Sequence, residues 1–501
     1  MTNSSPSWYH AQGWTGAVTL QGAAQQPENP GSRDPQILGM MGSWERVAMA
    51  LAGTSLLRSR GTRFIPQLPG EDADGYDARI AKFVHVPWFE ELTELAVHKL
   101  FRKTLNFQTE DETLQEWTGD VDGSGTDLEA FWKLVTKVAI QFGHCHVLTD
   151  MSTDMVPRTL LEEQQLAIKP NLFVIRPEQV VGFRTKRVAG RERLMQFRYL
   201  EMAQVEDGRY GSKWVERVRV LEPGKFELWE KADNRAESWS LIEQGTYDLD
   251  EIPVATVYGR REGVMVSSPP LLEVANLNLL YDLALCDHSH QMSVAATPIL
   301  VLKGFDEHQQ NLTVSVNRAL AMPPEGDVSY VQTDSASFQA QENYLKFLAD
   351  RMNQVAIVGF KEQKNGAEAA AAKRLDHSDE DAALSTIATS IETAVKQSVD
   401  WTLQYMGSTA EFDLGIPDNL SDETLDPQEV AQLLALNTSG VITKETLLET
   451  LVKGEVLDID PVEEAEMASQ QALDDLVQNQ EVMAEFAPKP AVGAKAPPSS
   501  K

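Results

Sequence analysis

The order of segments between Ser267 and Gly407 constrains this chain more than any other feature. A Pro-Pro dipeptide lies at the start of a predicted helix over Ser267–Ala296, because proline is favoured in the first helical turn. An insert without helical periodicity follows over Thr297–Asp334, and a second helix is predicted over Phe338–Asn353. A short loop then leads to an Ala-rich helix over Ala367–Tyr405. Long helices around a small insert predict an elongated shaft rather than a closed pocket.

Composition narrows the classes of protein that fit this order. The 501 residues suggest about three domain-sized units. The net charge of −31 excludes nucleic-acid binding by counterion release over much of the surface, although solubility alone would also explain it. Only Cys145 and Cys286 are present, which excludes a disulfide scaffold and favours a reducing compartment. No apolar run approaches the roughly 20 residues of a membrane span, and we expect no signal peptide.

The remaining segments predict a helix-rich α+β fold. Period-two alternation over Asn171–Val257 predicts an antiparallel β unit of about 90 residues. Beyond Gly407 we expect a strand at Glu411–Leu414 and then acidic helices beginning at Pro427 and Thr443. Before the β unit we expect helices over Ser43–Ala52 and Asp74–Val84, one from Pro87, and one capped by Thr126 or Asp127.

The motifs of common enzymes are missing from the sequence. It contains no phosphate-binding Gly-x-x-x-x-Gly-Lys-Ser/Thr loop and no Gly-x-Gly-x-x-Gly turn. It also contains neither a Gly-x-Ser-x-Gly elbow nor a His-Glu-x-x-His zinc motif. We therefore expect no enzymatic activity, no cofactor and no catalytic residues.

Two segments imitate metal sites. Asp120–Asp127 begins like a calcium-binding loop, but Phe131 stands at the twelfth position, where a bidentate Glu is required. A turn that caps the next helix is the better interpretation. His144 and His146 flank Cys145 in a predicted strand, and no second cluster of ligands accompanies them, so we expect no metal site.

Several short motifs follow one another along the chain, each occurring once. They are Phe64–Glu71 with Tyr76 and Arg79, Val97–Lys103, Arg176–Arg184, Pro269–Asn278 followed by Asp287 and Pro298, and Gly366–Ala370. Their order and spacing resemble the portal protein of tailed bacteriophages, particularly a portal group long named only as an uncharacterised phage domain. The resemblance covers about Asp34–Gly407, and Ala369 departs from it where a Thr is usual.

The resemblance implies a portal-type subunit with an α/β wing, a two-helix stem, a small α/β clip, a long helix after a tunnel loop, and a helical crown. The implied segments are a flexible arm over 1–33, the wing over 34–266, stem helices over 267–296 and 336–358, the clip over 297–335, the tunnel loop over 359–366, the long helix and a wing return strand over 367–421, the crown over 422–486, and a disordered tail over 487–501.

The resemblance also implies a function. Portals are rings, usually of twelve subunits, at one capsid vertex, and double-stranded DNA passes non-specifically through their channel during packaging and ejection. The implied partners are other copies of the chain, the terminase large subunit, a head-completion or adaptor protein, and the major capsid and scaffolding proteins, with no membrane. The implied location is the virion, after assembly in the host cytoplasm. Another oligomeric virion or scaffold protein without a DNA channel is the alternative.

Two sets of residues follow from this interpretation. A helix of roughly 27 residues is about 40 Å long, enough for a channel wall. The first set is an apolar stripe predicted to pack between subunits, comprising Leu272, Ala275, Leu279 and Leu283. The second set lies in the tunnel loop, where the lysines could contact phosphates briefly, and comprises Lys361, Glu362, Lys364 and Asn365.

Overall fold

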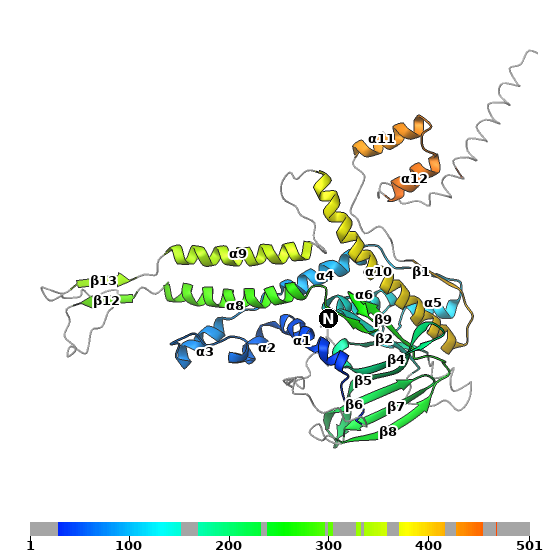
Figure 1. Cartoon of the computed structure of the whole chain (residues 1–501), viewed down its shortest axis with the longest axis horizontal. Helices are drawn as coiled ribbons and strands as arrows, with labels where there is room; N and C mark the ends of the chain where they lie inside the picture. Colours follow the sequence, from blue (N-terminus) through cyan, green and yellow to red (C-terminus); the bar gives the residue numbers. More distant parts are fainter. Residues whose placement is uncertain are drawn as a thin grey trace, which may run out of the picture. The chain divides into compact units, whose positions relative to one another are not determined.

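The chain divides into two compact units, Met1–Leu420 and Ser421–Lys501. The computed structural model in Figure 1 describes residues 29–151, 169–231, 238–295, 299–303, 327–331, 335–357, 370–415, 427–453 and 467. Helices and strands mix in the first unit, as the α+β prediction requires. Among the described helices, none is long and apolar enough to cross a membrane.

The described part of the first unit begins with four helices. Helix α1 starts at Pro35 rather than at Ser43, because Pro35 suits the first turn and the apolar stripe already begins at Ile37. The indole of Trp44 in α1 donates a 3.0 Å hydrogen bond to the carbonyl of Phe142, which joins this helix to α6. The four helices are α1 (Pro35–Ala50), α2 (Gly53–Ser59), α3 (Ala73–Lys82) and α4 (Trp88–Leu100), with a 3-10 turn at Gly61–Arg63.

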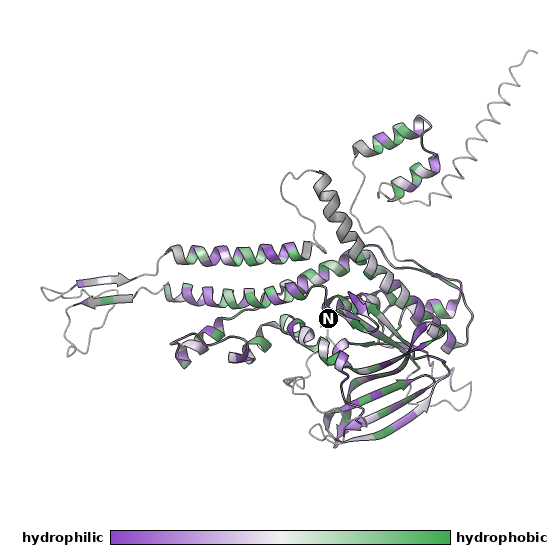
Figure 2. Ribbon diagram, in the orientation of Figure 1, coloured by the Kyte–Doolittle hydropathy of each residue, from purple (hydrophilic) through white to green (hydrophobic). Residues whose placement is uncertain are grey.

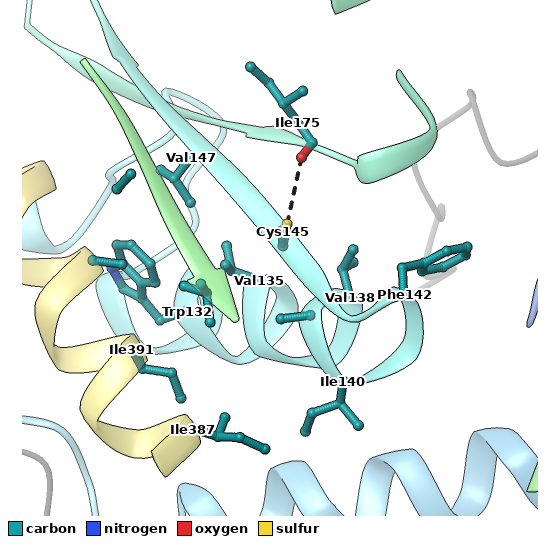
Figure 3. Close-up of a cluster of buried hydrophobic side chains, with 14 of the residues drawn as sticks. Trp132, Val135, Val138, Ile140, Phe142, Cys145, Val147, Ile175, Ile387 and Ile391 are labelled. Atoms are coloured by element: carbon teal, nitrogen blue, oxygen red, sulfur yellow. Dashed lines mark hydrogen bonds between the residues drawn. The ribbon is translucent and has the colours of Figure 1, made fainter. Parts of the chain in front are cut away.

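A three-stranded sheet lies at the centre of the core. Its order is β3 (Asn171–Ile175), β2 (His144–Asp150) and β9 (Val254–Tyr258), all antiparallel. Helix α6 (Leu128–Phe142) and helix α10 (Ala370–Met406) both pack against it. Figure 3 shows the side chains that fill this core, and the two helices contribute residues such as Trp132 and Ile391, both at most 1% exposed.

A second sheet of five strands follows the chain order as an antiparallel meander. The alternation over Asn171–Val257 predicted one β unit, and this was wrong in one respect. The first and last strands of that range, β3 and β9, pair with β2, which lies outside it. The five strands are β4 (Val180–Val188), β5 (Arg191–Asp207), β6 (Gly211–Glu222), β7 (Lys225–Lys231) and β8 (Trp239–Thr246), and a 3-10 turn at Pro177–Gln179 precedes them.

Short elements complete the described part of the first unit. The predicted strand near Glu411 is observed as β14 (Phe412–Gly415), which pairs antiparallel with β1 (Asn106–Thr109). The rings of Phe107 and Phe412 stack across this pair with centroids 5.7 Å apart. The remaining elements are α5 (Glu112–Thr118), β10 (Arg261–Gly263) and β11 (Val266–Ser267).

The segments predicted to form the shaft are helical. Helix α8 (Leu272–Ala295) and helix α9 (Ser335–Ile357) lie side by side in Figure 1 and run antiparallel. At 1.5 Å per residue, 24 residues of α8 extend about 36 Å. In the sequence between the two helices, strands β12 (Ile299–Lys303) and β13 (Asp327–Val331) pair antiparallel.

The second unit contains two described helices, α11 (Pro427–Thr438) and α12 (Lys444–Lys453). Both were predicted from their proline or threonine start. The hydroxyl of Thr443 accepts a hydrogen bond from the amide of Thr446 at 3.1 Å, which caps α12.

Candidate functional site

The candidate site consists of the helix pair α8–α9 and the residues around α3 and α4 that bond to α8. One side of α8 carries polar residues that are fully buried. The amide of Asn278 accepts from the backbone N–H of Phe89 at 2.9 Å and donates to the carbonyl of Val86 at 2.8 Å. Asp282, one turn further, accepts from the N–H of Val86 at 3.1 Å and lies 2.6 Å from Nδ1 of His85. These bonds attach the start of α4 to the N-terminal half of α8.

Burial has an electrostatic consequence at Asp282. Loss of solvent raises the pKa of its carboxyl above the usual range, while the bonds from His85 and Val86 oppose that rise. These two donors therefore favour the ionised form of the carboxylate against the effect of burial. Asn278 and Asp282 are four residues apart, so they lie on one face of the helix and act together as one attachment surface.

Arg79 forms the second attachment to α8. Its side chain is 2% exposed, and Glu71 accepts from it through both carboxylate oxygens, at 2.8 and 2.9 Å. The guanidinium also donates to the carbonyl of Pro66 at 2.6 Å and to Asp287 of α8 at 3.3 Å. The paired guanidinium lowers the pKa of Glu71 to about 2. The hydroxyl of Tyr76 donates to the carbonyl of Ile65 at 2.8 Å, so the whole turn is fixed.

These residues explain several of the sequence motifs. Glu71, Tyr76, Arg79 and Asp287 were quoted for their order along the chain, and the structure brings them into one cluster beside the C-terminal half of α8. Their shared role is structural, since each bond joins α3 either to the segment before it or to α8.

The two long helices contact each other through polar and apolar groups. Nδ1 of His288 lies 3.1 Å from Oε1 of Gln341, whose Nε2 donates to Gln291 at 2.7 Å. Near the other end, Arg351 pairs with Glu273 at 3.1 Å. Leu348 and Met352 of α9 are buried, at 2% and 0% exposure. The helix pair is thus joined along its described length.

Several large apolar side chains of the pair remain exposed. Leu280 and Met292 of α8 are 42% and 46% exposed, and Tyr344 and Phe347 of α9 are 44% and 60% exposed. Figure 2 shows hydrophobic and hydrophilic residues interspersed along both helices. Tyr344 and Phe347 are three residues apart, so they share one side of α9.

The apolar stripe predicted to pack between subunits mostly faces the core of the same chain. Ala275 and Leu279 are buried by the same chain, at 0% and 5% exposure, because α8 packs here against α1, α3 and α4. Leu272 and Leu283 are partly buried against the same core. Ala275 and Leu279 therefore cannot face a neighbouring subunit. The exposed residues of α9 were missed because amphipathic spacing alone does not tell which partner covers a face.

The predicted tunnel loop lies outside the described residues. This applies to all four of its candidates, Lys361, Glu362, Lys364 and Asn365, and their proposed role stays a prediction. Most of the predicted clip also lies outside the described residues, which include only the paired strands β12 and β13 between the two long helices.

The calcium-like segment is a turn, as predicted. Asp120 accepts from the amide of Gly125 at 2.9 Å and pairs with Lys169 at 3.1 Å. Asp127 caps α6 by accepting from the amide of Ala130 at 2.7 Å. The ammonium group of Lys169 thus balances the charge of Asp120.

His144 and His146 form part of an aromatic core. Their side chains share one face of β2, with ring centroids 4.8 Å apart, and Trp44 and Phe197 pack against them edge-on. Nδ1 of His144 bonds to the hydroxyl of Ser267. Burial lowers the pKa of His144 to about 3. Within the described ranges, no three His, Cys, Asp or Glu side chains are grouped to hold a metal.

Comparison with other proteins gives three results. No curated protein matches the chain at a significant level. Among solved structures, the chain is similar to one in the neck of a native gene transfer agent particle computed with C12 symmetry, at 11% identity and a TM-score of 0.39, covering 76% of this chain and 93% of that one. It is also similar to chains in the virion of the native particle and in the neck of the empty particle computed with C6 symmetry, each at 12% identity and a TM-score of 0.38, covering 77% of this chain and 94% of the other.

A family model matches the part of the chain that contains the two long helices of the candidate site. The match confirms the resemblance to an uncharacterised phage domain over this span, and it begins within the motif at Pro269–Asn278. Residues 270–406, from the start of α8 to the end of α10, match the family described as a domain of unknown function, DUF4055.

Proposed function

We propose that this chain is a portal subunit, which forms a ring at one capsid vertex with a channel for double-stranded DNA. The observation that carries the proposal is the antiparallel pair α8–α9 with paired strands between them. Helices about 35 Å long can line a channel when they are repeated around a ring. The match of residues 270–406 to a phage domain supports the same interpretation.

Ring formation would account for the apolar side chains that the single chain leaves exposed. Phe347 is 60% exposed and Tyr344 is 44% exposed, and both are of the residue types that anchor protein interfaces. In the proposed ring, α8 of the neighbouring subunit covers them. Burying a Phe side chain contributes roughly 1.5–3 kcal/mol, so a few such contacts per subunit would matter for assembly.

The charge of the chain supports passage of DNA rather than tight binding in the channel. A net charge of −31 disfavours adhesion of phosphates to most of the surface. Lys361 and Lys364 of the proposed tunnel loop would contact the phosphates briefly. A Lys361→Ala, Lys364→Ala double variant is expected to change DNA retention or packaging, and unchanged packaging and ejection would refute this role.

The proposed partners follow from the same role. The strands β12 and β13 would lie at one end of the proposed ring. That end would meet the terminase large subunit during packaging and a head-completion or adaptor protein afterwards. The segment before α8 would face the major capsid and scaffolding proteins. The proposed location is the head–tail junction of the virion, after assembly in the host cytoplasm, and the proposed role is structural rather than enzymatic.

Electron microscopy of the purified full-length protein tests the proposal. We expect closed rings with an axial hole, most simply of twelve subunits. A Tyr344→Glu, Phe347→Glu variant places carboxylates on the exposed side of α9 and is expected to prevent ring closure while leaving the fold unchanged.

A matched control separates interface effects from added charge. Tyr210 is 89% exposed at the turn between β5 and β6, so Tyr210→Glu adds charge at an exposed aromatic far from α9 in sequence. This control is expected to form rings. Oligomers without an axial hole would instead favour the alternative, an oligomeric virion or scaffold protein without a DNA channel. Rings that form normally in the α9 double variant would refute the assigned interface.

A further inference from the structure

The hairpin of β4 and β5 concentrates positive charge on an acidic chain. Residues 184–193 carry five cationic side chains and one carboxylate, a net charge of +4, whereas the whole chain has −31. All ten of these residues are exposed. The strand β4 changes from four buried residues to five exposed ones at Arg184, so the hairpin extends beyond the core.

The pairing of the hairpin places most of this charge on one face. Lys186 is directly opposite Arg193, and Val188 is directly opposite Arg191. Because cross-strand partners point to the same side and alternate residues share a face, Lys186, Arg191 and Arg193 lie together. Arg184 continues this face along β4. The only carboxylate among residues 184–193, Glu192, is opposite Arg187 on the other face.

The rest of the same sheet neutralises its cations in pairs. Arg217 bonds to Glu230 at 2.9 Å, and Arg219 bonds to Glu201 at 2.7 Å. Lys231 bonds to Glu216 at 2.9 Å. These three pairs join neighbouring strands, which shows the arrangement that stabilises this sheet.

Three cations of the hairpin lack such partners, whereas the charge of Arg184 acts on Glu222 of β6. No described carboxylate lies within ion-pairing distance of Lys186, Arg191 or Arg193. Like charges directly opposite each other, as in Lys186 and Arg193, destabilise a strand pair. The turn itself holds Ala189 at a φ of 50°, in the left-handed region that a non-glycine residue rarely adopts. The sequence here therefore costs stability and gives nothing to the core in return.

The chemistry of this face fits phosphates rather than a protein surface. It has guanidinium groups, which bind phosphate through two hydrogen bonds, and its one apolar member is Val188. Protein interfaces depend on buried aromatic or large apolar anchors, and the face has none. A two-stranded β ribbon also fits the major groove of B-form DNA, which is about 12 Å wide.

We propose that the exposed face of the β4–β5 hairpin, made by Arg184, Lys186, Arg191 and Arg193, binds the phosphate backbone of double-stranded DNA without sequence preference. This proposal does not rest on the portal role, since it concerns a surface outside the helix pair. The acidic remainder of the chain repels DNA, so the hairpin would be where a duplex makes contact.

The test measures binding of the full-length protein to a labelled duplex of random sequence, by fluorescence anisotropy, at 50 to 200 mM NaCl. Neutralising three or four phosphates gives a slope of about −3 in a plot of log affinity against log salt. Affinity should therefore fall roughly 50-fold over this range. The Lys186→Gln, Arg191→Gln, Arg193→Gln variant should lose most of the binding at 50 mM salt and most of the slope.

The matched control removes the same number of charges from the same sheet. Arg209→Gln, Lys213→Gln, Lys225→Gln changes three exposed cations outside the β4–β5 hairpin and should bind DNA like the wild type. Absence of wild-type binding at 50 mM salt would overturn the proposal, and so would equal loss in both triple variants. Stronger competition by poly-glutamate than by unlabelled duplex would show that the partner is an acidic protein surface. Unchanged binding in the Lys361→Ala, Lys364→Ala variant would separate this contact from the proposed channel.

Discussion

The buried pair of Arg79 and Glu71 gives the sharpest prediction about stability. The substitution Glu71→Gln keeps the shape of the side chain but removes its charge. Arg79 then remains charged at 2% side-chain exposure and loses one of its two bonds to residue 71. Breaking a buried ion pair by removing one partner costs about 3–5 kcal/mol. Since glutamine still accepts one bond, we expect a loss near the lower end, about 3 kcal/mol.

The lowered pKa of Glu71 gives a second estimate of the same free energy. Its pKa falls from 4.5 to about 2, chiefly because of the hydrogen bonds from Arg79. That shift corresponds to about 3 kcal/mol of preference for the ionised form. A carboxyl whose pKa is lowered by folding stabilises the protein fully above pH 4.5, and this contribution is lost as the pH falls towards 2. Glu71→Gln should therefore lose least stability relative to wild type at the lowest pH.

Urea unfolding monitored by tryptophan fluorescence measures the stability of the first compact unit, which contains Glu71. All ten tryptophans lie before residue 421, so their fluorescence reports on the first unit alone. The control is Glu392→Gln, which removes one partner of the exposed pair with Lys396 on α10 and should cost at most about 0.5 kcal/mol. If Glu71→Gln costs less than about 1 kcal/mol, or no more than the control, the cluster does not fix α3 against α8 as argued.

Three further predictions concern the core around α6. The pKa of His144 is lowered to about 3, so stability is complete above the unfolded value of 6.5 and falls as the pH drops, by about 2 kcal/mol at pH 5; urea unfolding of His144→Gln should show a flatter pH dependence. Gly143→Ala would place a Cβ 2.7 Å from the backbone of Ser268 at a φ of 95°, whereas Gly125 has open space, so thermal unfolding should shift much further for Gly143→Ala than for Gly125→Ala. Asp127→Ala removes the cap of α6 and should cost about 1 kcal/mol in urea unfolding, while Asp127→Asn should cost little.

Local patterns were enough to predict the long helices. The proline pair before α8, the proline at the start of α11 and the caps at Asp127 and Thr443 are local signals, and the structure confirms these elements. The start of α1 was missed because two glycines, Gly39 and Gly42, interrupt its pattern. Strand β2 was recognised only as a short segment of histidine and cysteine, and its role as the central strand depends on partners from elsewhere in the chain.

The candidate site could be located in the sequence but not assembled from it. Arg79 and Asp287 are separated by 208 residues, so only the fold shows that they meet. The same limit explains Ala275 and Leu279, whose spacing suggested an outward face although the chain itself covers them. The charge of the β4–β5 hairpin was visible in the sequence, but the strongly negative total concealed it.

The pairing of β1 with β14 has a consequence for synthesis on the ribosome. Asn106–Thr109 gains its only described strand partner from Phe412–Gly415, about 300 residues later in the chain. The first unit therefore cannot complete its fold until α10 and β14 have emerged, which makes its native contacts strongly non-local. At about 5–20 residues per second, the early strands wait some 15–60 s for this partner. A chain that stops before β14 would leave Phe107 without its stacking partner Phe412, and such products should be prone to proteolysis or aggregation.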